Sequence, residues 1–517
     1  MGIYLNPNYE NFRRTLAADI YVDKTMMIKE ISTFIDKGNN YICVSRPRRF
    51  GKTIATNMLA ANYSKGCDSR ELFSGLKISK DPSFEEKLNK YNLILIDLNS
   101  EYQNTKERDM LIDILTEKIK SEMRKEFPDV NIKEEYTLAE SMLEVFSATG
   151  ETFIIFIDEY DVLVREEVSE DLFGKYLSFL NGLFKSDTLR QAISLAYITG
   201  ILPVVRDRVQ SKLNNFEEYT ILDAANLAEY IGFTAEEVQS LCEEYNLDYE
   251  ECRRWYDGYS QHGYEIYNPQ SVVKALTTKK CKSYWSLTST YRVITERLKD
   301  NFAGMRDDVI RMLAGESVDV RVTTYMNTMN DFATRDDAFT YLIHIGYLAY
   351  NEDEETCRIP NREIWQEWES AVSVVNEYAQ TDEIIRTSKA LLQATIDGDE
   401  GAVARALDIS HIHVTSNRSY NNEDALQSAI YLAYLYALNK YTIVKEMTAG
   451  KGFSDVTFIP FEEGYPAMII ELKRNSSTAS AIDQIKEKQY FDSLSHYQGD
   501  LLFVGINYDE NDKTHEC

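Results

Sequence analysis

The sequence is poor in the residues that build disulfide frameworks and zinc sites. Its 517 residues include only seven cysteines and six histidines. The cysteines are odd in number, widely spaced and without a Cys-x-x-Cys pair, which argues against a disulfide framework or a zinc ribbon and fits a reducing compartment. His411 and His413 form the closest histidine pair, but no third ligand lies nearby in the sequence. We therefore interpret them as surface or loop residues.

Long apolar runs are also missing. No stretch reaches the length needed to span a bilayer, and Met1–Tyr4 leads into polar sequence instead of the apolar core of a signal peptide. The expectation is a cytoplasmic protein without a membrane partner. At this length two or three domains are expected, and 44% hydrophobic with 27% charged residues is ordinary for a globular chain.

Positive charge is scarce relative to negative charge. Lysine and arginine number 56 against 84 aspartates and glutamates, a formal net charge of −28. The field of the whole molecule therefore repels nucleic acid. Any nucleic-acid partner would have to bind a local patch in the C-terminal domain, where residues 438–490 hold equal numbers of basic and acidic side chains. An oligomer is compatible with the sequence, which gives no further information on assembly.

Periodicity predicts three regions. Residues 1–206 contain short, almost continuously apolar runs separated by helical patterns, which is typical of an α/β fold with a parallel sheet buried on both faces. The runs are 41–44, 91–97, 152–157 and 193–198. Residues 207–386 are largely helical, with a capping box from Thr234 to Glu237 and a loop-like interruption at Tyr259–Pro269. Residues 387–517 begin with helix and become rich in strands.

A nucleotide site is predicted at the end of the first apolar run. The turn from Arg46 to Gly51 is followed by Lys52 and Thr53 at the start of a helix. This order of strand, turn and helix N-terminus is that of a phosphate loop. Lys52 would neutralise the β- and γ-phosphates of ATP, and the Thr53 hydroxyl would bind Mg²⁺. Within the turn, Arg48, Arg49 and Gly51 are further candidate nucleotide contacts, whereas Arg46 replaces the usual first glycine.

The third apolar run ends in two adjacent acids that support this interpretation. Asp158 would bind Mg²⁺, and Glu159 would polarise the attacking water. The fourth run ends at Thr199, a candidate sensor of the γ-phosphate. Arg206 and Arg208 could contact phosphate, although a surface position is the simpler interpretation.

A metal-dependent nuclease site is predicted near the C-terminus. Gly464 marks a hairpin between the apolar runs 456–459 and 467–470. The hairpin would bring Asp455 close to Glu471, and Lys473 would face the same side of its strand as Glu471. Two carboxylates and a lysine at one sheet edge can bind a divalent metal and orient a water. Glu446 could also approach, but a surface acid is the simpler interpretation.

Several motifs follow one another in an order that resembles a known family. They are Tyr21–Thr25, Arg46–Thr53, Ile157–Asp161, Thr199–Ile201, Trp255–Tyr259 and Tyr267–Pro269. Together they look like bacterial AAA-ATPase-like proteins with a C-terminal PD-(D/E)xK nuclease domain, a restriction-endonuclease-like α/β fold. The arginine-rich loop is typical of that family.

The resemblance implies further site residues. It adds Glu423 as a helix-borne metal ligand, and Gln484 and Tyr490 in the helix after the sheet. The turn Gly452–Asp455 lacks the arginine usual in the superfamily. The aromatic residues in 255–259 and 264–269 could stack on bases, but packing within a helical lid is favoured.

Two functions remain open from the sequence. In the first, ATP binding and hydrolysis control a Mg²⁺-dependent nuclease that acts on nucleic acid. In the second, the chain is a nucleotide-dependent switch whose C-terminal domain binds a partner without cutting. The acidic balance and the missing arginine modestly favour the second.

Overall fold

The chain folds into two compact units. The computed structural model describes residues 2–166, 168–204, 213, 215–285, 291–324, 332–414, 430, 433–449, 452–461, 464–488, 494, 497 and 499–517. Unit 1 comprises Met1–Trp285 and Asp319–Asn361, and unit 2 comprises Ser286–Val318 and Arg362–Cys517. Each unit is thus assembled from two separate stretches of the chain. No helix among the residues described is both long and apolar enough to cross a bilayer.

A five-stranded parallel sheet forms the centre of unit 1. Its order is β2-β3-β4-β1-β5, and every neighbouring pair is parallel. The strands are β1 (Tyr41–Ser45), β2 (Asn92–Asp97), β3 (Phe153–Asp158), β4 (Ile193–Gly200) and β5 (Glu217–Tyr219). Every residue of β1, β3 and β4 is buried, as expected for continuous apolar strands covered on both faces. The predicted α/β fold and its four apolar strands are confirmed.

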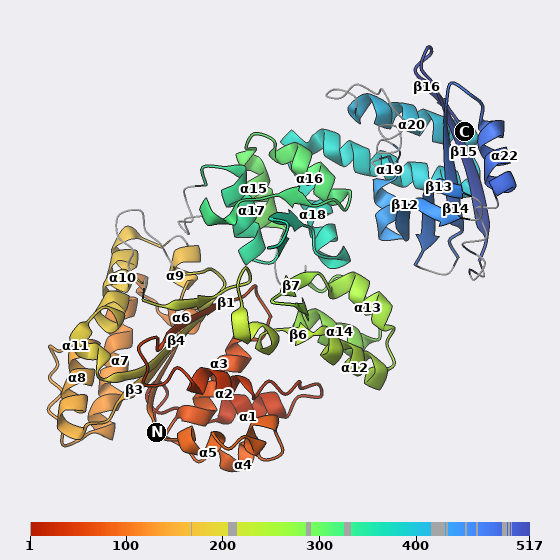
Figure 1. The fold of residues 1–517 in the computed structure, drawn as a ribbon. Coiled ribbons are helices and arrows are strands. Elements are labelled where there is room, and N and C mark those ends of the chain that lie inside the picture. The colour runs from red at the N-terminus through yellow and green to blue at the C-terminus, as the bar shows by residue number, and fades with distance from the viewer. Residues whose placement is uncertain are drawn as a thin grey trace. The chain divides into compact units, whose positions relative to one another are not determined.

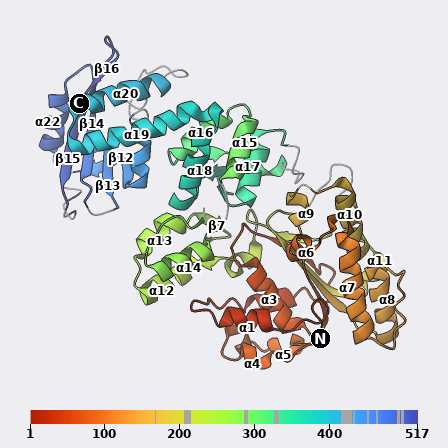
Figure 2. The ribbon, with the colours of Figure 1, turned by 180° about the vertical axis from the view of Figure 1, so that it is seen from behind.

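Helices cover both faces of this sheet (Figures 1 and 2). On one face lies α3 (Lys52–Tyr63), and on the other lie α7 (Leu111–Glu126), α8 (Leu138–Thr149) and α10 (Glu170–Phe184). The shorter helices are α1 (Glu10–Leu16), α2 (Met27–Ser32), α4 (Arg70–Phe73), α5 (Phe84–Lys87), α6 (Leu98–Asn104), α9 (Val162–Arg165) and α11 (Asp187–Arg190). Side chains of β3, α7, α8 and α10 share one buried apolar core.

A small helical subdomain follows the parallel sheet in unit 1. It contains α12 (Ala235–Tyr245), α13 (Tyr249–Tyr256) and α14 (Pro269–Thr278), with the antiparallel sheet β6 (Phe233–Thr234), β8 (Tyr264–Tyr267) and β7 (Tyr259–Gln261). The predicted capping box from Thr234 to Glu237 starts α12.

The expectation of a loop at Tyr259–Pro269 is wrong, because β7 and β8 form a tight hairpin there. Gln261 pairs with Tyr264, so the connection has only two residues, His262 and Gly263. Both have positive φ, 48° and 84°, as a type I′ turn requires. The usual residues at these two positions are Asn-Gly or Asp-Gly, so the His262-Gly263 pair gives only a weak sequence signal for a hairpin.

The second stretch of unit 1 adds α17 (Arg335–His344) and the hairpin β10 (Ala349–Asn351) with β11 (Thr356–Arg358). The chain enters this stretch within β9 (Val318–Asp319). Asn361 ends it, and its side-chain amide donates to the Asp257 carbonyl at 2.7 Å. The stretch is therefore fastened to the helical subdomain of the same unit.

Unit 2 joins a helical part to a five-stranded mixed sheet. The helices are α15 (Arg292–Asp300), α16 (Met305–Leu313), α18 (Arg362–Val374), α19 (Ala379–Asp397), α20 (Glu400–Val414) and α22 (Thr478–Lys488). The sheet order is β12 (Tyr441–Ala449), β13 (Gly452–Pro460), β14 (Ala467–Arg474), β15 (Leu501–Asp509) and β16 (Thr514–Glu516). β14 and β15 are parallel and connected through α22, whereas the other pairs are antiparallel. The hairpin predicted at Gly464 is confirmed between β13 and β14.

Candidate functional site

The predicted phosphate loop connects β1 to α3 through strained backbone. Gly51 precedes the first helical residue with φ +94°, and Arg49 has φ +70°. Positive φ is accessible to glycine but costs a non-glycine residue about 1 kcal/mol or more. Such strain persists only where the surroundings impose it, which makes this loop a candidate ligand site.

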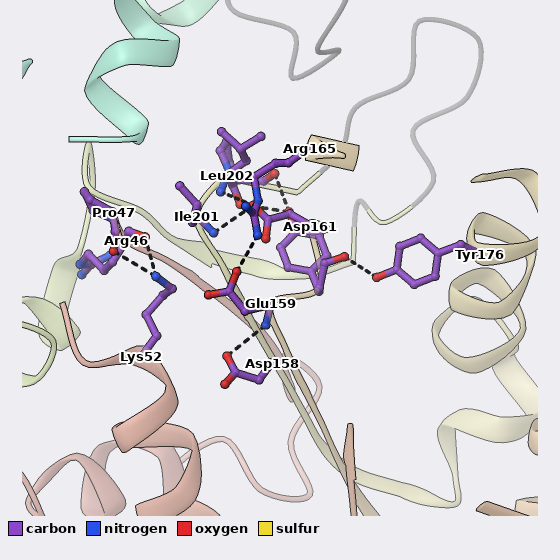
Figure 3. Close-up of polar contacts among 12 residues, drawn as sticks. Arg46, Pro47, Lys52, Asp158, Glu159, Asp161, Arg165, Tyr176, Ile201 and Leu202 are labelled. Carbon is purple, nitrogen blue, oxygen red and sulfur yellow. Dashed lines mark hydrogen bonds and ion pairs between the residues drawn. The ribbon is translucent and has the colours of Figure 1, made fainter. Parts of the chain in front are cut away.

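Lys52 points back into the curve of the loop (Figure 3). Its Nζ donates to the carbonyls of Arg46 and Pro47, both at 3.0 Å, and its side chain is buried. Burial lowers the pKa of Lys52, and the carboxylates of Glu159 and Asp158 oppose that shift. A desolvated ammonium among carbonyls is suited to neutralise a phosphate that enters the loop.

Arg46, which replaces the usual glycine, is fully buried and closes the loop against the sheet edge. Its Nη1 donates to the carbonyls of Ser45 at 2.8 Å and Tyr219 at 2.9 Å, which links the loop to β5. Burial lowers the pKa of the Arg46 guanidinium to about 10. Its Nε and Nη2 have no hydrogen-bond partner among the described residues. Arg48 is exposed and Arg49 is half-buried, so these two predicted contacts lie nearer to solvent.

The predicted acids and the sensor lie in one row across the strand ends. In the register of the sheet, Asp158 of β3 is opposite Asp97 of β2 on one side and Thr199 of β4 on the other. Burial raises the pKa of Asp158 to about 7; a hydrogen bond with Thr53 and the charge of Lys52 oppose this shift, while Glu159 adds to it. Thr199 is fully buried, and its Oγ1 has no hydrogen-bond partner within the described part of the chain. Lys52, Thr53, Asp158 and Thr199 are therefore brought together.

Glu159 is held by an ion-pair network that the sequence analysis missed. Its φ is +52°, and its Oε2 lies 2.6 Å from Nη2 of Arg165. Arg165 also pairs through Nε with Oδ2 of Asp161 at 3.1 Å (Figure 3). The same Asp161 oxygen accepts from the backbone amides of Ile201 at 3.0 Å and Leu202 at 2.9 Å. The spacing of four residues between Asp161 and Arg165 was the available signal, because such residues face each other on a helix.

The network also fixes the segment after β4. A Cβ on Gly200 would lie 2.6 Å from Oδ1 of Asp161 and 2.8 Å from the ring of Tyr160, so glycine is required there. Tyr160 donates its hydroxyl to the Pro203 carbonyl at 2.6 Å, and Tyr176 of α10 donates to the Tyr160 carbonyl at 2.5 Å. The strand that carries Thr199 is thereby coupled to the acids of β3. Arg206 and Arg208 lie outside the described residues.

Residues from beyond the parallel sheet cover the phosphate loop. Phe50 packs edge-on against Tyr259, with ring centroids 5.4 Å apart. The Tyr259 hydroxyl donates to the Gly346 carbonyl at 2.6 Å, and a Cβ on Gly346 would lie 2.8 Å from Pro47. Sequence reasoning gave no indication of Gly346, because nothing local connects it with the loop.

The aromatic residues of 255–259 and 264–269 pack as expected, with one exception. Trp255, Tyr256, Tyr259 and Tyr267 are buried, whereas Tyr264 is exposed.

The second candidate site is on β13 and β14 of unit 2. Oδ2 of Asp455 accepts from the Leu472 amide at 2.7 Å, which places it beside Glu471. Lys473 Nζ lies 3.2 Å from Glu471 Oε1 and donates to Gln484 Oε1 at 2.7 Å, and Gln484 also donates to Glu471. Burial, reinforced by the charge of Asp455, raises the pKa of Glu471 to about 7. The hairpin therefore brings Asp455, Glu471 and Lys473 together, with Gln484 of α22.

The residues of this second site fit a divalent cation. Glu471 is 1% exposed, and its Oε2 has no hydrogen-bond partner among the residues that the structure describes. An unpaired, buried carboxylate oxygen beside a second carboxylate is a site for a hard cation with oxygen ligands. No group of three or more His, Cys, Asp and Glu that could hold a metal occurs within the described ranges. Glu423, the third ligand implied by the family resemblance, lies outside those ranges, as does Tyr490.

Comparison with known proteins identifies both regions. Residues 7–210 match the model of a family described as predicted AAA-ATPase, and residues 421–516 match that of the PD-(D/E)XK nuclease superfamily. An uncharacterised protein from the vnfD 5′ region of Azotobacter chroococcum mcd 1 is 20% identical over 519 residues, which cover 96% of this chain and 94% of that protein.

Two solved structures resemble the chain at low similarity. A Walker-type ATPase of Pyrococcus abyssi is 14% identical with a TM-score of 0.35, over 67% of this chain and 94% of that one. The Aeropyrum pernix ORC1 protein, solved in complex with DNA, is 11% identical with a TM-score of 0.25, over 96% of this chain and all of that one.

The two family matches coincide with the two sites described above: the first includes the phosphate loop and the acids of β3, and the second includes the cluster around Glu471. The chain accordingly contains an AAA-ATPase-like domain within residues 7–210 and a PD-(D/E)XK nuclease superfamily domain within residues 421–516.

Proposed function

We propose that this protein binds and hydrolyses ATP and uses the nucleotide state to control a Mg²⁺-dependent nuclease that acts on nucleic acid. The observation that carries the nuclease assignment is the unpaired, buried Oε2 of Glu471 beside Asp455 and Lys473. The matches to the two domain families support ATP hydrolysis and nucleic-acid cleavage as classes of activity. What we add is that the nucleotide state of the first domain controls cleavage by the second.

In the nucleotide site, Lys52 would neutralise phosphate, and Thr53 with Asp158 would hold Mg²⁺, which supplies charge neutralisation for phosphoryl transfer. Glu159 would orient the attacking water, and Thr199 would accept a hydrogen bond from that water or donate one to the γ-phosphate. Arg165 pairs with Glu159 at 2.6 Å and therefore fixes the direction in which this carboxylate points. The shared network through Asp161 supports a link between the state of the site and the segment after β4.

In the nuclease site, Asp455 and Glu471 would hold Mg²⁺, which supplies Lewis-acid polarisation of the scissile phosphate. Lys473 would orient the attacking water and stabilise charge on the phosphate. Gln484 bridges Lys473 and Glu471, so it holds both side chains in place. The high pKa of Glu471 supports cation binding, since a cation would favour the ionised form that burial disfavours.

The second candidate is a nucleotide-dependent switch whose nuclease-like domain binds a partner without cutting it. The net charge of −28 favours it, because that charge opposes nucleic-acid binding over most of the surface. Phe453 and Ser454, which precede Asp455 on β13, also leave this segment without the arginine usual in the superfamily. Cleavage assays distinguish the two candidates directly.

The test measures ATP hydrolysis and cleavage of DNA and RNA by the purified full chain in Mg²⁺ or Mn²⁺. Lys52→Ala should abolish hydrolysis and alter cleavage, while Glu471→Gln should abolish cleavage alone. The matched controls are Lys37→Ala and Asp483→Asn, at exposed positions outside the two sites. Cleavage that persists in Glu471→Gln would reject the nuclease site. Cleavage that does not depend on ATP or on Lys52→Ala would reject control by the nucleotide. The absence of cleavage in every condition would favour the second candidate, the nucleotide-dependent switch.

A further inference from the structure

A second cation, Arg165, lies beside the acids of the predicted nucleotide site. It is the last residue of α9, and its side chain is only 10% exposed. Its Nε pairs with Oδ2 of Asp161 at 3.1 Å, and its Nη2 lies 2.6 Å from Oε2 of Glu159. The remaining nitrogen, Nη1, forms no hydrogen bond with the residues that the structure describes. Arg165 therefore keeps one donor group for a ligand.

Asp161 anchors the guanidinium of Arg165. This carboxylate is fully buried, and its Oδ2 also accepts from the amides of Ile201 and Leu202, which follow directly after β4. Burial disfavours the charged form of Arg165, but the charges of Asp161 and Glu159 outweigh this effect and raise the pKa of the guanidinium. Arg165 is thus a permanently charged group in a fixed position.

The position of Arg165 is set by the carboxylate that would orient the attacking water. In the view of Figure 3, the carboxylate of Glu159 lies between Lys52 and Arg165. Burial lowers the pKa of Lys52, and the charges that act on this lysine include the opposing ones of Glu159 and Arg165. A water bound to Oε2 of Glu159 would lie one further hydrogen bond from Nη2 of Arg165. The guanidinium is therefore within reach of the phosphoryl group that such a water attacks.

The site contains more carboxylates than cations that interact with them. The cations are Lys52 and Arg165, and the carboxylates in the described part of the chain are Asp97, Asp158, Glu159 and Asp161. A triphosphate adds negative charge, which spreads over the γ-phosphate oxygens during transfer. Lys52 is bound to the carbonyls of Arg46 and Pro47 in the loop. Arg165 is thus the cation on the side of the attacking water.

We propose that Arg165 is a catalytic residue of ATP hydrolysis, whose Nη1 donates to a γ-phosphate oxygen in the transition state while Nη2 stays on Glu159 and Nε on Asp161. The inference rests on the proposed function, which makes ATP the substrate of the first site. The water oxygen bonds to the γ-phosphorus, and Glu159 accepts the proton of that water. The bond from the γ-phosphorus to the β–γ bridging oxygen breaks, and its electron pair leaves with ADP. The products are ADP, inorganic phosphate and a proton.

Replacement by lysine separates the ion pairs of Arg165 from the proposed phosphate contact. An ammonium keeps the positive charge, but it cannot donate in the fixed directions of a guanidinium fork. Arg165→Lys can therefore pair with Asp161 or Glu159 without reaching the phosphate. The matched control is Arg14→Lys. Arg14 pairs through Nε with Glu10 at 3.1 Å and with the same spacing of four residues, but it is exposed on α1.

The first measurement compares the binding of fluorescent mant-ADP to the full chain in Mg²⁺ with and without aluminium fluoride, which stands in for the transferred phosphoryl group. Aluminium fluoride should tighten binding by the native chain and by Arg14→Lys at least about a hundredfold, as expected of a transition-state analogue. Arg165→Lys should bind mant-ADP alone within about twofold of the native chain and lose most of the tightening. A residue with only a structural role would not change this ratio.

The second measurement is single-turnover hydrolysis of ATP, which separates a phosphate contact from a role through Glu159. Arg165→Lys should slow this step by about a thousandfold. Added to Glu159→Gln, it should slow hydrolysis at least about another tenfold, because the phosphate contact does not require the carboxylate. A residue that only positions Glu159 would add nothing in that background.

Urea unfolding without nucleotide shows whether each variant is folded. If Arg165→Lys does not fold, Arg165→Gln combined with Asp161→Asn replaces the buried ion pair with two amides and should lose the tightening as well.

Two results would overturn the inference: tightening by aluminium fluoride in Arg165→Lys equal to that in Arg14→Lys, or hydrolysis by the double variant with Glu159→Gln no slower than that of Glu159→Gln alone. A native chain that neither binds mant-ADP nor hydrolyses ATP would reject the proposed ATPase function, and the inference with it. If the native chain hydrolyses ATP and the Arg165 variants match the control, the inference alone fails.

Discussion

Asp158 in the ATPase-like site and Glu471 in the nuclease-like site are both buried carboxyl groups, and burial raises the pKa of each to about 7. Their surroundings differ. Asp158 lies beside Lys52 and a hydrogen-bonding Thr53, and its neighbours Glu159 and Asp161 share the cation of Arg165. Glu471 uses one oxygen for Lys473 and Gln484, while the other has no partner among the described residues. The carboxylates of the first site are paired with cations of the chain itself, whereas the second site leaves one buried carboxylate oxygen for the cation that we propose.

The largest expected effect is on turnover at the first site. Glu159→Gln should slow ATP hydrolysis by about a hundredfold or more, because the general-base contribution of a positioned carboxylate is commonly of that size. The Kd for ATP should stay within about twofold, since Glu159 would not bind the phosphates. Single-turnover hydrolysis and equilibrium binding separate the two quantities. The exposed Asp171→Asn serves as control, and a native rate in Glu159→Gln would remove Glu159 from the mechanism.

The next largest effect is on the free energy of unfolding, which should depend more on Asp161 near the first site than on Asp455 in the second. Asp161→Ala should lower the free energy of unfolding by about 3 kcal/mol, because the largely buried Arg165 and the amides of Ile201 and Leu202 each lose the fully buried carboxylate as a partner. Asp455→Ala should cost less, about 1.5 kcal/mol, because the variant loses the hydrogen bond to the Leu472 amide but also relieves the repulsion between the Asp455 charge and Glu471. Urea unfolding of both variants measures the difference. Equal losses of unfolding free energy in the two variants would contradict the view that charged contacts within the chain stabilise the first site more than the second.

Glu471 should make stability depend on pH and on Mg²⁺. Its folded pKa of about 7 is above the unfolded value of 4.5, so the folded state holds the proton more tightly. Its contribution is therefore fully present below pH 4.5 and is lost as pH rises to about 7, on the order of 3 kcal/mol in total. Mg²⁺ should restore stability at pH 8 and have little effect at pH 5.

The measurement is the difference in unfolding free energy between the native chain and Glu471→Gln across this pH range. The difference cancels the parallel contribution of Asp158, whose pKa is raised in the same direction. A difference that does not change with pH, or a Mg²⁺ effect that survives in Glu471→Gln, would show that the unpaired oxygen is not the cation ligand.

The smallest expected effect concerns Thr199. Thr199→Val should change the unfolding free energy by less than about 1 kcal/mol, because the buried hydroxyl makes no hydrogen bond with the described residues and gives none up. ATP hydrolysis should nevertheless fall, since a sensor hydroxyl acts only when nucleotide is bound. Thermal unfolding without nucleotide and steady-state hydrolysis test the two statements. Unchanged hydrolysis would leave Thr199 as a packing residue.

Local sequence patterns were sufficient where one strand or one turn determines the structure. The continuous apolar runs predicted β1, β2, β3 and β4, because a strand buried on both faces has no polar positions. Gly464 predicted the β13–β14 hairpin, and strand alternation placed Glu471 and Lys473 on one side. These features depend on residues a few positions apart.

Features that depend on distant contacts were missed. Gly346 packs on Pro47 of the phosphate loop, but no sequence pattern near Pro47 predicts this contact. It depends on how residues 319–361 pack within unit 1. The pairing of Glu159 with Arg165 depends on the positive φ of Glu159, which departs from the usual backbone preference of that residue. The catalytic, nucleotide-binding and metal-binding roles stay predictions for every residue of the two sites, including those that the structure brings together.

The interleaving of the two units has a consequence for the order in which the chain is made. A ribosome that has completed Trp285 has supplied the phosphate loop and both acids of β3, but not Gly346, which packs on Pro47. The next residues belong to unit 2, whose remaining sequence starts only at Arg362. Because domains fold as units during synthesis, neither unit can complete its core when its first stretch emerges. All of unit 1 has been made at Asn361, before residues 421–516 with Asp455 and Glu471 are synthesised, so the nucleotide site can finish folding before the nuclease-like site exists.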